Sequence, residues 1–99
     1  MTEAELQALI VEVAELHDWL VFHDNDSRRN VAGFPDLVLV KSPRVLFLEL
    51  KSEIGRVRAE QHAWMDALSR CDTIASAIVR PEHAERVIEY LQNPERPKK

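Results

Sequence analysis

The segment Val45–Lys51 constrains the fold more than any other part of the sequence, because it combines five apolar residues with Glu49 and a terminal Lys51. Side chains alternate between the two faces of a β-strand, so both faces of this strand are apolar before the two charges are reached. A strand that is apolar on both faces is typical of the centre of a sheet with other elements packed on both sides. Glu49 and Lys51 therefore carry a large desolvation penalty at the end of a buried strand.

Helical and strand patterns alternate around this segment. Thr2 and Glu5 have capping-box spacing, and apolar residues follow them at helical intervals, which predicts a helix to about His17. Ser42-Pro43 predicts a turn that joins two neighbouring strands as a hairpin. We predict helices over 3–17, 59–68 and 81–91, and strands over 19–22, 36–40, 44–51 and 73–79. The order αβββαβα predicts an α/β fold with a central mixed sheet flanked by helices.

A chain of 99 residues is short for more than one domain. We predict a single domain over residues 1–93 and a flexible C-terminal tail over 94–99, because the tail has nothing to bury. No apolar stretch exceeds four residues, and no basic segment precedes an apolar run at the start. We therefore expect neither a membrane span nor a secretory signal, which predicts a cytoplasmic protein.

Charge is distributed unevenly along the chain, although the net charge is only −4. Residues 1–27 contain seven acidic residues and no Lys or Arg, whereas residues 28–58 contain seven Lys and Arg against three acids. A basic middle in an acidic chain suits local contact with phosphates and keeps non-specific binding to nucleic acid weak. A solvated surface of mixed charge explains the same pattern equally well on charge alone.

Asp36 stands at the start of the strand that precedes the Val45–Lys51 segment. In an antiparallel hairpin the start of one strand lies beside the end of the next, so Asp36 is expected to meet Glu49 and Lys51. Two carboxylates suit Mg²⁺ or Mn²⁺, and a lysine can orient a water or stabilise charge on phosphorus. These groups point to metal-assisted hydrolysis of a phosphodiester. A salt bridge at a strand end is the structural alternative, and the spacing does not decide between the two.

The histidines lack the spacing of zinc ligands, and we expect them at the surface or at strand edges. They are His17, His23, His62 and His83.

A longer set of motifs resembles one nuclease family. Pro35-Asp36 followed by Glu49-Leu50-Lys51 matches the PD-(D/E)XK pattern of restriction-endonuclease-like nucleases. The wider set resembles the VRR-NUC domain, the virus-type replication-repair nuclease, in its small stand-alone phage or bacterial form. The likeness extends from Glu3 to Leu91 and implies the same αβββαβα order. The wider set comprises Ser27-Arg28-Arg29, Gly33-Phe34-Pro35-Asp36-Leu37, Phe47-Leu48-Glu49-Leu50-Lys51, Gly55-Arg56 and Gln61.

The resemblance implies a role for each matching residue of the catalytic site. Asp36 and Glu49 would be metal ligands together with the backbone carbonyl of Leu50. Lys51 would be the catalytic lysine, and Gln61 would support the site from the following helix.

The family also uses a glutamate of the first helix, for which Glu3 and Glu5 both remain open. Glu5 already has a capping role, and Glu3 has the family's spacing to Gln7, so we favour Glu3. The residues expected to hold DNA phosphates are Ser27, Arg28, Arg29, Arg56 and Arg58.

The sequence therefore predicts a Mg²⁺- or Mn²⁺-dependent, structure-specific DNA endonuclease. The resemblance further implies a homodimer similar to Holliday-junction resolvases, with branched DNA as substrate. A nuclease of the same fold that trims flaps or single strands is the enzymatic alternative. A catalytically inert nucleic-acid-binding module and a purely structural partner are the alternatives from other classes.

Overall fold

The computed structural model describes residues 1–23 and 31–94 and forms a four-stranded sheet with helices on both sides. The elements in chain order are α1 (Glu3–Leu16), β1 (Leu20–His23), β2 (Leu37–Lys41), β3 (Arg44–Leu50), α2 (Ala59–Ser69), β4 (Ala75–Val79), the 3₁₀ turn η1 (Pro81–His83) and α3 (Ala84–Gln92). The predicted αβββαβα order and the α/β class are confirmed. No helix within the described ranges is long and apolar enough to cross a membrane.

The sheet is mixed, with the strand order β1-β2-β3-β4. β1, β2 and β3 pair antiparallel in succession, whereas β4 runs parallel to β3. β3 therefore has a neighbour on each side, as its doubly apolar pattern predicts. Leu37 pairs with Leu48 in the β2–β3 ladder, so the preceding residue, Asp36, falls opposite Glu49.

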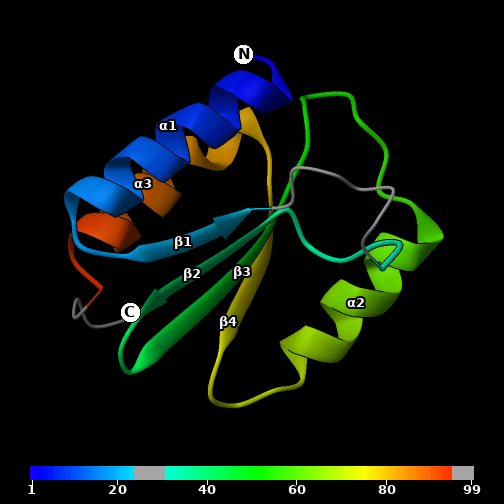
Figure 1. Ribbon diagram of the computed structural model, residues 1–99. Coiled ribbons are helices and arrows are strands. Elements are labelled where there is room, and N and C mark those ends of the chain that lie inside the picture. The colour runs from blue at the N-terminus through cyan, green and yellow to red at the C-terminus, as the bar shows by residue number, and fades with distance from the viewer. Residues whose placement is uncertain (24–30, 95–99) are drawn as a thin grey trace.

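The main core lies between one face of the sheet and the helices α1 and α3. Figure 1 shows these two helices side by side on that face and α2 on the opposite side. Leu6 and Ile10 of α1 are fully buried against Leu37, Leu39 and other leucines of the sheet. Leu91 of α3 closes the same core.

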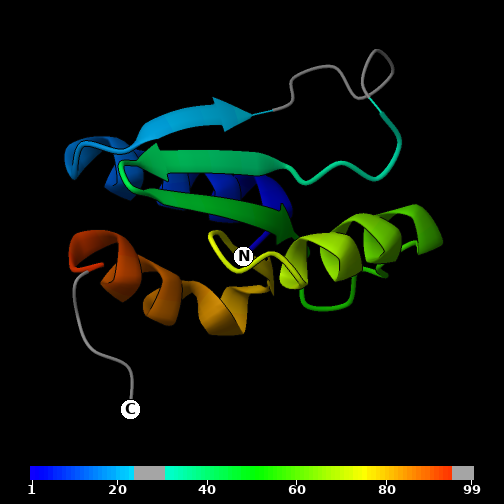
Figure 2. The same ribbon diagram turned by 90° about the horizontal axis from the view of Figure 1, so that it is seen from below.

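The second face carries a smaller aromatic cluster beneath α2. Phe34 lies edge-on to Trp64 of α2 and to Phe47 of β3, with ring centroids 5.0 and 6.2 Å apart respectively. Gly33 has a φ of +85°, and a Cβ added there would lie 2.5 Å from the Glu60 carbonyl carbon. Glycine is therefore required for the chain before Asp36 to pass this close to the start of α2. In Figure 2, α2 lies at the end of the sheet where β2 begins and β3 ends.

The structure corrects several element boundaries. β1 runs from Leu20 to His23, because the Trp19 N–H donates to the Ala14 carbonyl at 2.9 Å and the ladder with β2 begins only at Leu20. The Trp19 side chain is buried in the core, where its Nε1 donates to the Leu91 carbonyl at 3.0 Å. Asp36 and Lys51 lie immediately outside β2 and β3 rather than within them. The predicted strand 73–79 begins at Ala75, and the last helix begins with a 3₁₀ turn at Pro81.

Candidate active site

Asp36 and Glu49 converge where β2 begins and β3 ends. Pro35 is buried and fixes the chain before Asp36, whose Oδ2 accepts a hydrogen bond of 2.8 Å from the Leu50 N–H. This bond holds the Asp36 carboxyl beside the end of β3. Glu49 occupies that end and is only 1 % exposed. The structure thus brings the two predicted carboxylates together.

Gln61 reaches Glu49 from the first turn of α2. Its Nε2 donates to Oε2 of Glu49 at 2.6 Å, while its Oε1 accepts from the Arg58 N–H at 2.8 Å. The second bond satisfies one of the backbone N–H groups that are unpaired at a helix start. One side chain therefore caps α2 and fixes the orientation of the buried glutamate.

Lys51 completes the buried group of charges. Its Nζ lies 3.8 Å from Oε2 of Glu49, and the residue is 7 % exposed. Its backbone N–H donates to the Val79 carbonyl at 2.9 Å, so β4 sets the course of the chain where β3 ends. The ammonium group is close enough to favour ionised Glu49, but at 3.8 Å it makes no hydrogen bond.

The two carboxyl groups are poorly stabilised as anions. Burial, followed by the charge of Asp36, raises the pKa of Glu49 from 4.5 to about 8. Burial also raises the pKa of Asp36, and the charge of Glu3 acts in the same direction on both groups. The Leu50 N–H and the Lys51 ammonium oppose the shift of Asp36 without cancelling it. The site therefore favours the arrival of positive charge.

Glu49 has a buried oxygen, Oε1, with no hydrogen-bond partner among the described residues. An unsatisfied buried carboxylate oxygen is costly in a metal-free fold, but it is what a coordination bond requires. Within residues 1–23 and 31–94, no three His, Cys, Asp or Glu side chains are grouped closely enough to hold an ion by themselves. Mg²⁺ commonly uses one or two carboxylates, with waters and substrate phosphates as its other ligands. Asp36 and Glu49 fit this mode of binding.

Glu3 lies on the rim of the site, whereas Glu5 is engaged elsewhere. Glu5 completes a capping box, in which its Oε1 accepts from the Thr2 N–H at 2.8 Å and its own N–H donates to Thr2 Oγ1 at 3.1 Å. Glu3 is exposed and, with Asp36, lines a pocket of about 430 Å³. This pocket also contains Glu49, Lys51, Arg58 and Gln61.

The predicted DNA-binding residues divide into two groups. Arg56 and Arg58 are exposed and line an adjoining hollow of about 620 Å³ together with Lys51. Ser27, Arg28 and Arg29 lie outside the described residues, as do residues 95–99 of the predicted tail.

Two residues near the site have no role in the sequence predictions. His23 ends β1 and, with Glu3, Gln7 and Asp36, lines a hollow of about 470 Å³, and its buried Nδ1 has no partner among the described residues. Arg80 follows β4 and donates to two carbonyls of the segment after Lys51. No local sequence pattern indicates these contacts of Arg80, because they join residues 28 and 25 positions apart.

The chain matches the family described as VRR-NUC domain over residues 2–89. No curated protein and no solved structure matches it in the same comparisons. The family match spans the elements that carry Asp36, Glu49, Lys51 and Gln61, and the mixed sheet is compatible with a PD-(D/E)XK-like nuclease fold. The chain therefore belongs to the VRR-NUC domain family, and this membership implies a nuclease that binds DNA.

Proposed function

We propose that the protein is a Mg²⁺- or Mn²⁺-dependent DNA endonuclease that cleaves branched DNA as a homodimer. The observation that carries the catalytic part of this proposal is the pairing of half-buried Asp36 with fully buried Glu49. Both carboxyls have raised pKa values, and Glu49 keeps one buried oxygen without a partner. A pair held in this way gains stability when a divalent cation binds.

In this proposal each residue of the pocket has its own task. Asp36 and Glu49 hold the cation, with the carbonyl of Leu50 as a further ligand and Glu3 on the rim. When bound, the cation supplies Lewis-acid activation of a water and neutralises charge that develops on the phosphate. Gln61 keeps Glu49 in its ligating orientation.

Lys51 and the arginines act on the substrate. Lys51 points its ammonium group into the same pocket as the two carboxylates, where it orients the attacking water or stabilises negative charge on phosphorus. Arg56 and Arg58 bind neighbouring phosphates of the strand, since they line the adjoining hollow. Ser27, Arg28 and Arg29 are proposed to extend this contact.

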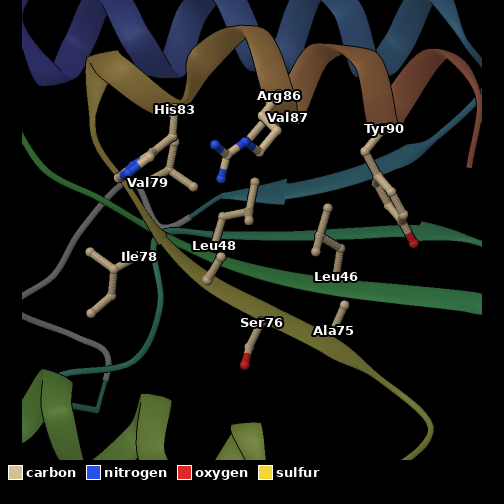
Figure 3. Close-up of a pocket in the computed structure, with 11 residues that line it drawn as sticks. Leu46, Leu48, Ala75, Ser76, Ile78, Val79, His83, Arg86, Val87 and Tyr90 are labelled. Atoms are coloured by element: carbon tan, nitrogen blue, oxygen red, sulfur yellow. The ribbon is translucent and has the colours of Figure 1, made fainter. Parts of the chain in front are cut away.

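The homodimer is supported by β4, which forms one edge of the sheet and has no strand on its outer side within residues 1–23 and 31–94. Ala75 and Ala77 of this strand are exposed, and an unpaired strand edge is a template for association. Beside it lies an apolar pocket of about 530 Å³, in which Leu46 and Leu48 of β3 face Val87 and Tyr90 of α3 (Figure 3). A second copy on this edge would provide the two active sites that cleavage of two strands requires.

Cleavage of labelled DNA by the purified protein tests this function. A four-way junction, a flap, a single strand and a linear duplex are compared with Mg²⁺, with Mn²⁺ and with a chelator. We expect paired cuts in the junction that need the metal and disappear in Lys51→Ala. Equal cutting of the linear duplex would exclude junction specificity. Binding without a metal-dependent product in any substrate would identify an inert DNA-binding module instead.

Light scattering tests the dimer separately. We expect a mass of twice the 11.4 kDa of one chain. The mass of a single chain at the concentration used for cleavage would exclude the dimer.

A further inference from the structure

Arg80 ties the end of β4 to the segment 52–58, which directly follows Lys51. Its Nη1 donates to the carbonyl oxygens of Ser52 at 2.7 Å and of Gly55 at 2.9 Å. The backbone of Arg80 is itself held, because its N–H donates to Nδ1 of His83 at 3.0 Å. The Arg80 backbone is therefore fixed, and its guanidinium group holds Ser52 and Gly55, which are distant in sequence.

The residue before Arg80 holds the same stretch of chain at its start. The Val79 carbonyl accepts from the Lys51 N–H at 2.9 Å. Gly55 then comes back against the lysine, since a Cβ added to it would lie 3.5 Å from Cδ of Lys51. Residues 79 and 80 together fix the path of the chain from Lys51 to Gly55.

The segment held in this way carries two exposed cations into the proposed substrate path. Arg56 and Arg58 are exposed and line the hollow of about 620 Å³. Glu3, Lys51 and Arg58 line both this hollow and the pocket that contains Asp36 and Glu49. A DNA strand with one phosphate in the pocket of Asp36 and Glu49 would therefore pass along the segment 52–58.

We propose that Arg80 is a positioning residue, which holds the segment 52–58 in the shape that Arg56 and Arg58 need to bind a phosphate beside the active site. This inference rests on the proposed function, because it explains how Arg80 supports DNA binding without contacting the DNA itself. An unbraced segment would have to be ordered each time DNA binds, and this cost lowers affinity. Arg80 thus acts on substrate binding more than on the chemical step.

Two variants of Arg80 and one matched control test the inference. Arg80→Gln removes the charged donor, whereas Arg80→Lys keeps a cationic donor on a shorter side chain. Arg70→Gln serves as the control, because the Arg70 side chain, directly after α2, is 75 % exposed and forms its ion pair with Asp66 four residues before it. Thermal unfolding of each protein first establishes that it is folded.

The first measurement needs no nuclease activity. Trypsin cuts after Arg56 and Arg58, so mass spectrometry of brief digests reports how far the segment opens in the folded protein. We expect cutting after these two residues to be about tenfold faster in Arg80→Gln, intermediate in Arg80→Lys and unchanged in Arg70→Gln. Equal rates in all four proteins would overturn the inference.

The second measurement uses DNA cleavage. We expect Arg80→Gln to raise KM about fivefold to tenfold, with kcat changed less than twofold. The slope of log binding constant against log salt concentration should fall by about one, which corresponds to the loss of one phosphate contact. Arg80→Lys should recover part of the KM. A fall in kcat with unchanged KM would contradict the proposed role.

If wild type cleaves no DNA, the proposed function fails, whereas the trypsin measurement still decides whether Arg80 holds the segment 52–58. If Arg80→Gln does not fold, the comparison of Arg80→Lys with wild type decides the same question.

Discussion

Gln61 donates a hydrogen bond of 2.6 Å to Oε2 of Glu49, and the same side chain accepts a hydrogen bond from the N–H of Arg58, the N-cap residue of α2. The orientation of the buried glutamate is thus coupled to the start of a helix that packs on the other side of the sheet from α1. Partners of this kind fix the direction in which a ligand oxygen points.

Replacing Gln61 with Ala should reduce both metal affinity and cleavage. We expect a loss of about tenfold to 100-fold in Mn²⁺ affinity or kcat/KM, because Glu49 loses the donor that orients it. Loss of the helix cap should also cost about 1 kcal/mol of unfolding free energy. Titration with Mn²⁺ and urea unfolding measure the two effects. His62→Ala, an exposed neighbour on the same helix, is the control, and an equal loss in both variants would contradict this role for Gln61.

The stability of the metal-free protein should fall as the pH rises. Glu49 has a pKa of about 8 in the folded protein, against 4.5 without the fold, so the native state holds a proton that the unfolded chain releases. Its contribution to stability is complete below about pH 4.5 and is lost as the pH approaches 8. The raised pKa of Asp36 acts in the same direction.

Thermal unfolding of wild type and Glu49→Gln in a chelator measures this dependence. We expect the variant to unfold at a higher temperature than wild type at pH 8 and at a similar temperature near pH 4.5. Added Mg²⁺ should stabilise only wild type at pH 8. Parallel pH curves for the two proteins would show that Glu49 is not the group responsible.

Gly33→Ala should destabilise the fold and weaken cleavage. The positive φ of Gly33 disfavours a side chain, and the added Cβ would lie 2.5 Å from the Glu60 backbone. We expect a cost of about 1–3 kcal/mol, measured by urea unfolding, because the chain must move away from α2. Ala32→Gly at the exposed neighbouring position is the control. An unchanged unfolding midpoint in Gly33→Ala would mean that this close approach is not required.

Replacement of Lys51 should affect catalysis and not the binding of the metal. We expect Lys51→Ala to lower kcat by about 100-fold to 1,000-fold, as loss of a single charge-stabilising donor does in other enzymes. Its affinity for Mn²⁺ should stay within about threefold of wild type, since the ammonium group is not a ligand. Single-turnover cleavage and calorimetry separate the two effects. Retained cleavage in this variant would remove Lys51 from the mechanism.

The meeting of Asp36 and Glu49 could be predicted because it needs only local information. Strand alternation, the hairpin turn and antiparallel pairing determine which residue lies beside the end of β3. The observed register, with Leu37 opposite Leu48, follows from the same pattern. The sequence pattern also predicted that a doubly apolar β3 would lie inside the sheet.

The supporting contacts could not be derived in this way, because they join segments that approach one another only in the folded protein. The task of Gln61 was implied by family resemblance, and its reach to Glu49 depends on where α2 begins. Arg80 contacts carbonyls 28 and 25 residues away, which no periodicity reveals. The choice between Glu3 and Glu5 stayed open in the sequence, with Glu3 favoured. In the structure Glu5 is engaged in the capping box with Thr2, whereas Glu3 lines the pocket.

Calorimetric titration of Mn²⁺ into wild type, Asp36→Asn and Glu49→Gln tests the central claim most directly, in buffers of different ionisation enthalpy at pH 7. We expect binding to wild type with release of protons, since carboxyls with raised pKa values must ionise to coordinate the ion. Each variant should lose at least about tenfold in affinity and release fewer protons. Binding of equal affinity in all three proteins, or release of no protons by wild type, would contradict the assignment of Asp36 and Glu49 as the metal ligands.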